Sequence, residues 1–202
     1  MIDWLHNIDE QLFLAINGAW PAGDTIMWGV SNPFMWTPLY IVMIYYVLKL
    51  HKGRTTRLII LIGTLVCIGA ADILSARILK PTTARLRPSH RVELVDEIKL
   101  YEKSDGEIYR GGKYGFVSSH AANHMGLAVF IGAIICSGFY GWWILGLIAW
   151  AILIGYSRVH LGVHYPGDVI CGWLFGATIG ALVYHFISPN LNLARLNQGA
   201  TT

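Results

Sequence analysis

The sequence predicts an all-α fold: a polytopic transmembrane helical bundle of about five spans, with an N-terminal helix in the membrane interface. Two observations predict it. Of the 202 residues, 54% are hydrophobic and only 13% are charged, whereas soluble domains carry about 25% charged residues. The hydrophobic residues are also grouped in runs, close to the roughly 20 residues that a helix needs to cross a bilayer. A chain of this length is expected to form one membrane domain, residues 1–202.

The N-terminal segment, residues 1–20, is expected to be an amphipathic helix. Its apolar residues recur at helical spacing, and Trp4 and Trp20 stand near its two ends, as in helices that lie in the plane of the interface. The acidic residues Asp9 and Glu10, together with the lack of a basic leading segment, argue against a cleavable signal peptide. A sixth crossing by this segment is the alternative.

Five apolar runs follow, and each is expected to cross the membrane as a helix. They lie at about 34–50, 58–80, 118–136, 142–156 and 166–187. The first run is short and carries prolines in "SNPF" and "TPL", which interrupt helices. It is therefore expected to recruit part of the preceding "TIMWGVS" to reach spanning length.

Basic residues predict the orientation of the bundle. The connection "KLHKGRTTR" between the first two runs holds four lysines and arginines and no acidic residue, which is typical of a cytoplasmic loop. Because successive spans alternate sides, the long polar loop 81–115 and the turn 157–165 are then expected on the outer, periplasmic side of the cell inner membrane. Residues 188–202 are expected to form a cytoplasmic tail.

Charge and cysteine content exclude some classes of function. The net charge is only +3, and the basic residues are dispersed among apolar runs, so nucleic-acid binding is not expected. The three cysteines stand in apolar segments without paired spacing, which argues against disulfides and a cysteine metal site. The expected partners are the lipid bilayer and a substrate within it.

Three polar clusters stand at helix ends that this topology brings to one side: "KPTTARLRP", "VSSH" and "SRVHLGVHYPGD". Charged groups close to lipid are costly, so a cluster of them indicates a functional site. Lys80, Arg87 and Arg158 supply fixed positive charge suited to an oxyanion. Ser118 and Ser119 add hydroxyls and the free N–H groups of a helix start, which favour anions.

The histidines of these clusters indicate covalent catalysis. His164 and Asp168 are four residues apart at the start of a helix, where the carboxylate can hold one ring nitrogen and leave the other to attack. His120, on another helix, can protonate a leaving oxygen as general acid. The pairs His120/His124 and His160/His164 could instead bind a metal, but the nearby cations disfavour a divalent ion. No metal and no cofactor are therefore expected.

The three clusters together resemble the signature of the type 2 phosphatidic acid phosphatase superfamily. The matching residues are Lys80 with Arg87 and Pro88, Ser118 to His120, and Ser157 and Arg158 with His164 and Asp168. The usual Pro-Ser-Gly-His is altered here, because Val117 replaces the proline and Ser119 the glycine. The extra side chain reduces backbone freedom at Ser119 and adds a hydroxyl to the pocket.

The resemblance implies a membrane phosphatase that forms a phosphohistidine without a metal. His164 is then the nucleophile, Asp168 its partner and His120 the general acid. The implied phosphate-binding set is Lys80, Arg87, Arg158, Ser118 and the backbone at Ser119.

For a small member of such a family, undecaprenyl diphosphate is the first expected substrate. Phosphatidylglycerol phosphate and the phosphates of lipid A are the alternatives. A vanadate-dependent haloperoxidase would use a similar oxyanion pocket, but the membrane spans argue against it. A lipid-phosphate binding or transport protein without turnover is disfavoured because binding alone needs no oriented nucleophile such as His164 with Asp168.

Other polar residues near the clusters have simpler interpretations. Arg85 is expected at the rim of the pocket rather than on the phosphate. His124 and His160 are expected to pack beside the site, and Asp72 to form a hydrogen bond between helices. The loop 89–115 covers the pocket in this interpretation, either as a lid or as a plain connector.

Overall fold

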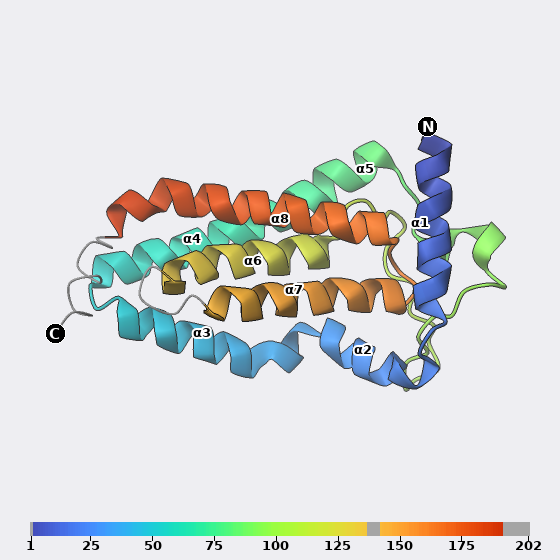
Figure 1. Ribbon diagram of the computed structural model, residues 1–202, viewed down its shortest axis with the longest axis horizontal. Coiled ribbons are helices and arrows are strands. Elements are labelled where there is room, and N and C mark those ends of the chain that lie inside the picture. Colours follow the sequence, from blue (N-terminus) through green and yellow to red (C-terminus); the bar gives the residue numbers. More distant parts are fainter. Residues whose placement is uncertain (1, 137–141, 192–202) are drawn as a thin grey trace.

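A computed structural model describes residues 2–136 and 142–191. Across these residues the fold is helical and contains two isolated β-bridges but no β-strand. The α-helices are α1 (Ile2–Asn17), α2 (Asp24–Ser31), α3 (Thr37–Leu50), α4 (Arg54–Ile73), α5 (Lys80–Thr83), α6 (Ser119–Cys136), α7 (Trp142–His160) and α8 (Pro166–Ile187). The helices α3, α4, α6, α7 and α8 run lengthwise side by side, and α1 crosses one end of this bundle (Figure 1).

The described helices confirm the all-α polytopic bundle. Four helical stretches are long and apolar enough to cross a membrane: Pro33–Leu50, Arg54–Thr83, Trp142–His160 and Pro166–Asn190. A fifth, somewhat shorter apolar helix covers Ser119–Ile135. The protein is thus a multi-pass membrane protein, with the third expected span, 118–136, carried by this shorter helix.

Helix α1 lies across the bundle end rather than along it, which is the arrangement expected of an interfacial helix (Figure 1). Trp4 leaves 63% of its surface exposed, and Leu5 and Leu12 are exposed as well, whereas Phe13 is completely buried. Phe13 packs against the ring of Tyr165, with ring centroids 5.5 Å apart. One face of α1 therefore closes the end of the bundle and the other is left for lipid headgroups.

The expected first span is divided into two helices. A 3₁₀ turn, Pro33–Trp36, separates α2 from α3, because Pro33 has no N–H to continue the helical hydrogen bonding. The Asn32 side chain caps this turn by accepting a hydrogen bond from the Phe34 N–H at 3.0 Å. The "TIMWGVS" segment is thus helical as expected, but it forms a separate helix that packs against α7.

The second span continues beyond its expected end at residue 80. Helix α4 passes into a π-helical turn, Leu74–Leu79, and then into α5, which ends at Thr83. The Lys80 N–H bonds to the carbonyl of Ser75, five residues back. Pro81 follows at once and cannot donate to the preceding turn, so the local hydrogen bonding departs from the α-helical pattern.

The fourth span also ends later than expected. Helix α7 continues to His160, so Arg158 is helical, and the expected turn 157–165 is reduced to residues 161–165. Gly162 reverses the chain with a φ of +77°, a conformation that suits glycine. The fifth span, α8, has the expected bounds.

Close packing of α8 on α6 aligns the two helix starts that carry the site. Gly172, Gly176 and Gly180 of α8 face α6, and a Cβ on Gly176 would lie 2.1 Å from the Ala122 carbonyl oxygen. Such stripes of small residues let membrane helices approach each other closely. At the end of this contact the Ser118 N–H donates to the Asp168 carbonyl oxygen at 3.0 Å.

Candidate active site

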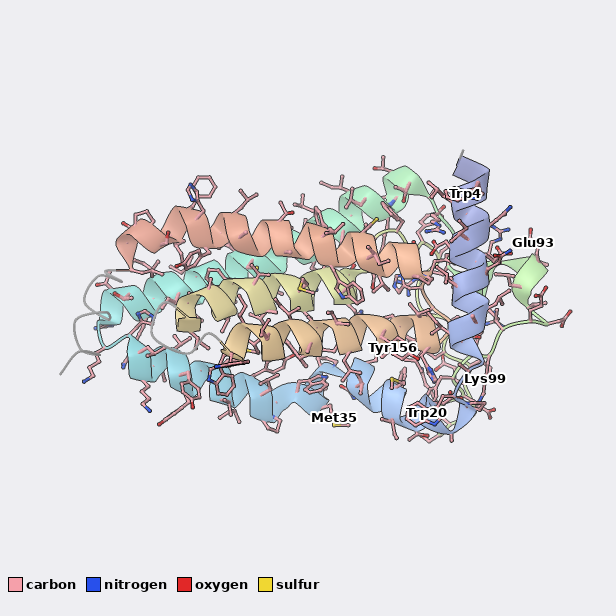
Figure 2. All side chains as sticks on the ribbon, in the orientation of Figure 1. Trp4, Trp20, Met35, Glu93, Lys99 and Tyr156 are labelled. Atoms are coloured by element: carbon pink, nitrogen blue, oxygen red, sulfur yellow. The ribbon has the colours of Figure 1, made fainter. Side chains whose placement is uncertain are left out.

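The residues of the three clusters lie at the end of the bundle that α1 crosses. This end collects α5, the start of α6, the end of α7 and the start of α8 (Figure 1). The loop between α5 and α6 extends beyond α1, with Glu93 and Lys99 on it (Figure 2). Helices distant in sequence therefore bring all three clusters together.

His164 and Asp168 form a buried pair at the start of α8. His164 Nδ1 donates to Asp168 Oδ2 at 3.3 Å, and neither side chain has appreciable exposure. The same carboxylate oxygen accepts the Tyr165 N–H at 3.2 Å, one of the free amides of the helix start. Since Nδ1 carries the proton in this hydrogen bond, the lone pair of a neutral His164 is on Nε2.

His164 is held in its neutral form. Burial is the largest cause lowering the pKa of His164 well below its usual range, and the charges of Arg87, Arg158 and Lys80 lower it further. A contact with the Gly115 backbone carbonyl opposes this in part. The ring is thus an uncharged potential nucleophile among three cations.

Arg87 is positioned by a short extended pairing. Its N–H donates to the Lys113 carbonyl at 3.1 Å, and its Nε donates to the Tyr114 carbonyl at 3.1 Å. Burial and the nearby Arg158 charge lower the pKa of Arg87 to about 10. Gly111 has a φ of +65°, and a Cβ there would lie 2.5 Å from the Arg87 guanidinium. Arg87 is therefore a buried cation in a position that an anion would stabilise.

Lys80 and Ser119 are directly bonded. Lys80 Nζ donates to Ser119 Oγ at 2.7 Å, and the buried Ser75 hydroxyl donates to the same oxygen at 2.8 Å. A serine hydroxyl has two acceptor lone pairs and one donor hydrogen. When the Ser75 hydrogen is on Ser119 and not on the Asp72 carbonyl, which lies 3.1 Å from the Ser75 hydroxyl, both lone pairs of Ser119 are occupied and its own O–H is free to donate to a ligand.

Arg158 is buried and is fixed by residues outside the three clusters. Its guanidinium donates to Ser31 Oγ at the end of α2 and to the Tyr109 hydroxyl, the latter at 2.7 Å. Its Nε is buried without a protein partner in the part of the chain that the structure describes. The helix break after α2 therefore places Ser31, the last residue of α2, beside Arg158.

The remaining predicted residues are Ser118 and His120 at the start of α6. Ser118 is fully buried, and its hydroxyl lies 3.5 Å from the Ala121 N–H. His120 lies within electrostatic range of His164, Arg87 and Arg158. All eight predicted site residues are therefore on the same side of the bundle, next to one another.

Three residues with simpler interpretations have defined contacts. His160 Nε2 lies 2.9 Å from Asp24 Oδ1, which fastens α7 to α2. Asp72 accepts a hydrogen bond from Asn123 of α6 at 3.3 Å, as expected for a bond between helices. Arg85 is not a plain rim residue, because its NH1 donates to Asp168 Oδ1 at 2.8 Å.

No three or more His, Cys, Asp or Glu side chains in residues 2–136 and 142–191 are grouped so that they could hold a metal ion. The metal independence of the chemistry stays a prediction.

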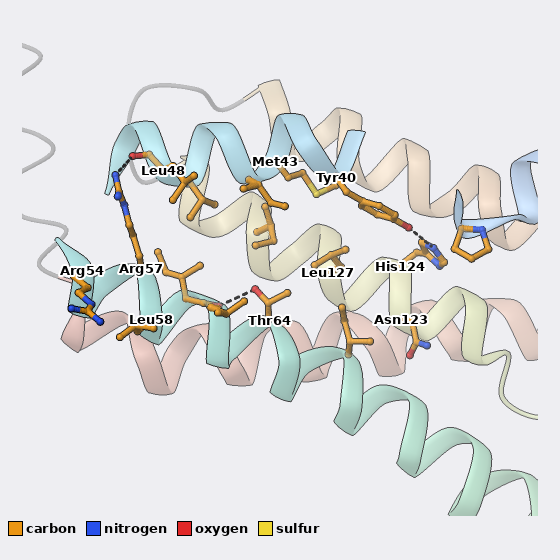
Figure 3. Close-up of a pocket in the computed structure, with 17 residues that line it drawn as sticks. Tyr40, Met43, Leu48, Arg54, Arg57, Leu58, Thr64, Asn123, His124 and Leu127 are labelled. Atoms are coloured by element: carbon orange, nitrogen blue, oxygen red, sulfur yellow. Dashed lines mark hydrogen bonds between the residues drawn. The ribbon is translucent and has the colours of Figure 1, made fainter. Parts of the chain in front are cut away.

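An apolar cavity of about 700 Å³ lies between α3, α4 and α6. Met43, Leu61 and Leu127 are among the apolar side chains that line it. Figure 3 shows His124 near one end of it and Arg57 near the other. His124 Nδ1 bonds to the His120 carbonyl at 2.8 Å, so the cavity reaches the neighbourhood of the site.

Comparison with known proteins identifies the family. The model of the PAP2 superfamily matches residues 55–191, a range that includes all three clusters. This chain belongs to the PAP2 superfamily. A PAP2 protein of this kind is a lipid phosphatase, a hydrolase that acts on phosphate esters.

Three curated relatives of this PAP2 protein are phosphatases. Lipid A 4'-phosphatases of Porphyromonas gingivalis and Bacteroides thetaiotaomicron are 33% and 34% identical to it, over 91% and 98% of this chain and 74% and 84% of theirs. An undecaprenyl-diphosphatase of Sulfolobus acidocaldarius is 32% identical over 75% of this chain and 63% of its own.

A solved structure shares the fold of this PAP2 protein. It is the crystal structure of a transmembrane PAP2-type phosphatidylglycerolphosphate phosphatase from Bacillus subtilis, with a TM-score of 0.62 and 22% identity. The match covers 91% of this chain and 88% of that one.

Sequence reasoning missed several residues that hold the site together, among them Asp9, Ser31, Ser75 and Tyr109. Ser75 could have been found from its position five residues before Lys80 on the same helix. The others come from distant segments, and no local pattern connects them to the three clusters.

Proposed function

We propose that this protein hydrolyses a phosphate ester of a membrane lipid through a phosphohistidine on His164. The observation that carries the proposal is the neutral, buried His164, held through Nδ1 by Asp168 and surrounded by the charges of three cations. A nucleophile, its orienting carboxylate and a set of fixed cations are the groups that phosphoryl transfer requires.

The first step is attack of His164 Nε2 on phosphorus. A nitrogen–phosphorus bond forms while the ester phosphorus–oxygen bond breaks, and His120 donates a proton to the leaving oxygen. The hydrogen bond from Nδ1 to Asp168 stabilises the positive charge that the ring gains. The lipid alcohol, or lipid monophosphate if the substrate is a diphosphate, then leaves.

The second step is hydrolysis of the phosphoenzyme. Water attacks phosphorus, His120 takes up a proton from that water, and the nitrogen–phosphorus bond breaks to return the electron pair to His164 Nε2. Inorganic phosphate leaves, and His164 and His120 return to their starting forms. In both steps Lys80, Arg87 and Arg158 stabilise the negative charge on the transferred group, and Ser119 can donate its free O–H to it.

The cavity supports a substrate with a long hydrocarbon chain. It follows α4 from Arg54 to Ile68, about 21 Å at the rise of an α-helix. Its lining is apolar, and Leu61 and Ile44 on its wall are largely exposed at the surface of the bundle, where lipid is expected. A chain could therefore occupy the cavity while its headgroup meets the cations at the bundle end.

We propose a phosphate of a lipid A-type lipid as the first substrate to test, because two relatives, matched over 91% and 98% of this chain, are lipid A 4'-phosphatases. Undecaprenyl diphosphate, the first expectation from the sequence, is the second candidate. Two observations favour it: the undecaprenyl-diphosphatase relative, and a cavity longer than the roughly 15 Å of half a bilayer core.

The outer face of the membrane is the proposed side of the site. The basic loop "KLHKGRTTR" supports this orientation, since it lies at the bundle end opposite α1 (Figure 1).

The test is phosphate release from a panel of lipid phosphates by the purified protein in detergent, with excess chelator present. Turnover that persists with chelator is expected, and loss of all turnover on chelation would contradict the proposed chemistry. His164→Ala is expected to reduce turnover by at least 10³-fold, in the range seen when nucleophiles are removed.

Two controls make this test specific. His185→Ala removes an exposed histidine at the far end of α8 and should retain full activity. Brief mixing with a ³²P-labelled substrate followed by alkaline quench should trap acid-labile phosphate on the wild-type protein and not on His164→Ala. Label retained by His164→Ala would assign the nucleophile to another residue.

A further inference from the structure

Arg85 bridges two carboxylates at the start of α8. Its NH1 donates to Asp168 Oδ1 at 2.8 Å, and its NH2 donates to Asp9 Oδ2 of α1 at 2.6 Å. We propose that Arg85 and Asp9 are positioning residues that set the orientation of Asp168, and through it of His164, so that the seating of α1 controls the rate of chemistry. This inference rests on the proposed function of His164 as nucleophile.

Both oxygens of Asp168 are committed to this arrangement. Oδ2 accepts from His164 and from the Tyr165 N–H, and Oδ1 accepts from Arg85. Because the side chain is fully buried, no solvent can replace a lost donor. Without Arg85 the carboxylate could turn about its last bond and lose the geometry that holds the imidazole.

Asp9 binds both Arg85 and the first turn of α8. Its Oδ1 accepts the Gly167 N–H at 2.7 Å, one of the amides that a helix start leaves without a partner. A Cβ on Gly167 would lie 2.7 Å from Asp9 Oδ2, so the absence of a side chain there permits the contact. The α1 carboxylate is thus docked directly onto the first turn of α8, where negative charge is favourable.

Aromatic rings around Arg85 add further contacts between α1 and the site. The Arg85 guanidinium lies over the Tyr165 ring, 4.4 Å from its centroid. The same ring meets Phe13 and His6 of α1 edge-on, at 5.5 and 5.7 Å. Arg85 is therefore held by an aromatic face as well as by two carboxylates, and α1 supplies one wall of this contact.

The extended segment around Leu86 explains why Arg85 and Arg87 both face the start of α8 but have different partners. The Gly115 N–H donates to the Arg85 carbonyl at 2.8 Å, and Leu86 forms a β-bridge with Tyr114. In extended backbone, residues two apart point to the same side, so Arg85 and Arg87 both face the start of α8. Arg85 meets the carboxylates and Arg87 keeps no carboxylate partner among the described residues.

A lysine would not reproduce the contact of Arg85. The guanidinium offers several N–H donors in a fixed fork that can serve two carboxylates at once, whereas an ammonium is a single point of charge. Arg85→Lys is therefore expected to retain only part of the effect.

The test compares kcat and KM for Arg85→Gln, Arg85→Lys, Asp9→Asn and the double variant Asp9→Asn/Arg85→Gln with lipid phosphate in detergent. Arg85→Gln should lower kcat by about 10- to 100-fold, by analogy with the loss of partners that orient metal-ligating side chains, and leave KM nearly unchanged. Asp9→Asn should lower kcat by less. The double variant should lose less than the product of the two single losses, because Asp9 and Arg85 are hydrogen-bonded to each other and share their effect on Asp168.

Chemical rescue separates positioning from a general structural role. The Arg85 side chain is 25% exposed, so guanidinium added to Arg85→Ala should reach the gap and raise kcat at least threefold. Lys103→Gln is the control, because Lys103 is a cation on the same loop that pairs with exposed Glu107, and it should keep wild-type kcat and show no response to guanidinium.

The outcomes are distinguishable from failure of the proposed function. If the wild-type protein releases phosphate and Arg85→Gln keeps its kcat, the inference is overturned and the phosphatase stands. A loss confined to KM, strictly additive effects of the two variants, or no rescue of Arg85→Ala by guanidinium would also overturn it. A wild-type protein without turnover on any lipid phosphate would overturn the proposed function instead.

Discussion

At the scale of single residues, the central feature is a histidine that stays uncharged beside three cations. Burial and positive neighbours act in the same direction on His164. Desolvation disfavours the charged form of an imidazole, and like charges nearby disfavour it further. Crowding Lys80, Arg87 and Arg158 costs free energy through the repulsion of their charges. In the proposed function a bound phosphate offsets that cost, so the site is expected to prefer anions.

The lowered pKa of His164 predicts an unusual acid limit for the reaction. In the free protein the neutral nucleophile should persist below the ordinary histidine pKa of about 6.5, so the acid limb of kcat/KM should fall below that value. Activity should be lost only as the pH drops through the lowered pKa. The measurement is a pH profile of kcat/KM with a soluble phosphomonoester whose own ionisation is corrected for.

The same shift also affects stability. Below about pH 6.5 the unfolded chain binds a proton at this histidine and the folded chain does not, so folded stability should decrease as the pH falls. In the activity profile, an acid limb of kcat/KM well above pH 6.5 would contradict the burial of His164 among cations.

The residues proposed to carry the chemistry are already evident as sequence patterns, whereas those proposed to orient them are only partly so. Lys80, Arg87 and His164 stand in short patterns with fixed spacing, because each is placed by the helix end on which it stands. Asp9 has no such pattern. Its partner Arg85 is 76 residues away, and the contact exists only because α1 folds across the bundle end.

At the scale of elements, departures from regular helices decide where the site residues point. The prolines at the start of the first run were expected to interrupt it, and the break lies at Pro33, whereas the π turn before Lys80 was not predicted, although Pro81 stands beside it. A proline shows that backbone hydrogen bonding changes nearby, but whether the chain kinks, stops or widens depends on the packing around it. Helix existence was thus predictable and helix ends were less so.

Among the contacts between helices, the packing of α6 against α8 supports the site most directly. Gly176→Ala would place a Cβ 2.1 Å from the Ala122 carbonyl oxygen, so the helices must separate. We expect a loss of about 1–3 kcal/mol in stability, the usual cost of overpacking. Activity should fall with it, because the hydrogen bond between Ser118 and Asp168 closes this contact. Thermal unfolding in detergent measures the first effect.

Gly69→Ala in α4 is the matched control for that substitution. A Cβ at Gly69 has no heavy atom within 4 Å, and alanine is the better helix former by about 1 kcal/mol. This variant should be as stable as the wild type or more so. Equal behaviour of the two alanine variants would show that the α6–α8 contact tolerates separation.

At the scale of the whole molecule, the cavity along α4 joins the lipid-facing side of the bundle to the site. Leu61→Trp would fill part of it, since Leu61 lies on its lining. Excluding two methylenes of a bound chain costs about 1.6 kcal/mol, so KM for a long-chain lipid phosphate should rise about tenfold. Turnover of a short, water-soluble phosphomonoester should be unchanged.

Leu65→Trp controls for the size of the new side chain. Leu65 stands one turn further along α4 and is 63% exposed, against 55% for Leu61, but it is not on the cavity wall. It should leave KM for both substrates unchanged. A rise in KM with both variants would indicate an effect on α4 as a whole and not on the cavity.

Because one side of the cavity is exposed on the lipid-facing surface, the concentration of substrate that matters is its concentration within the membrane. A lipid that enters sideways between α3 and α4 never passes through water, so its encounter with the site is a collision in two dimensions. The relevant variable is its mole fraction in the membrane or micelle, and adding inert detergent at fixed total substrate should slow the reaction. The host cell could therefore regulate the enzyme by membrane composition alone, without any change in the amount of protein.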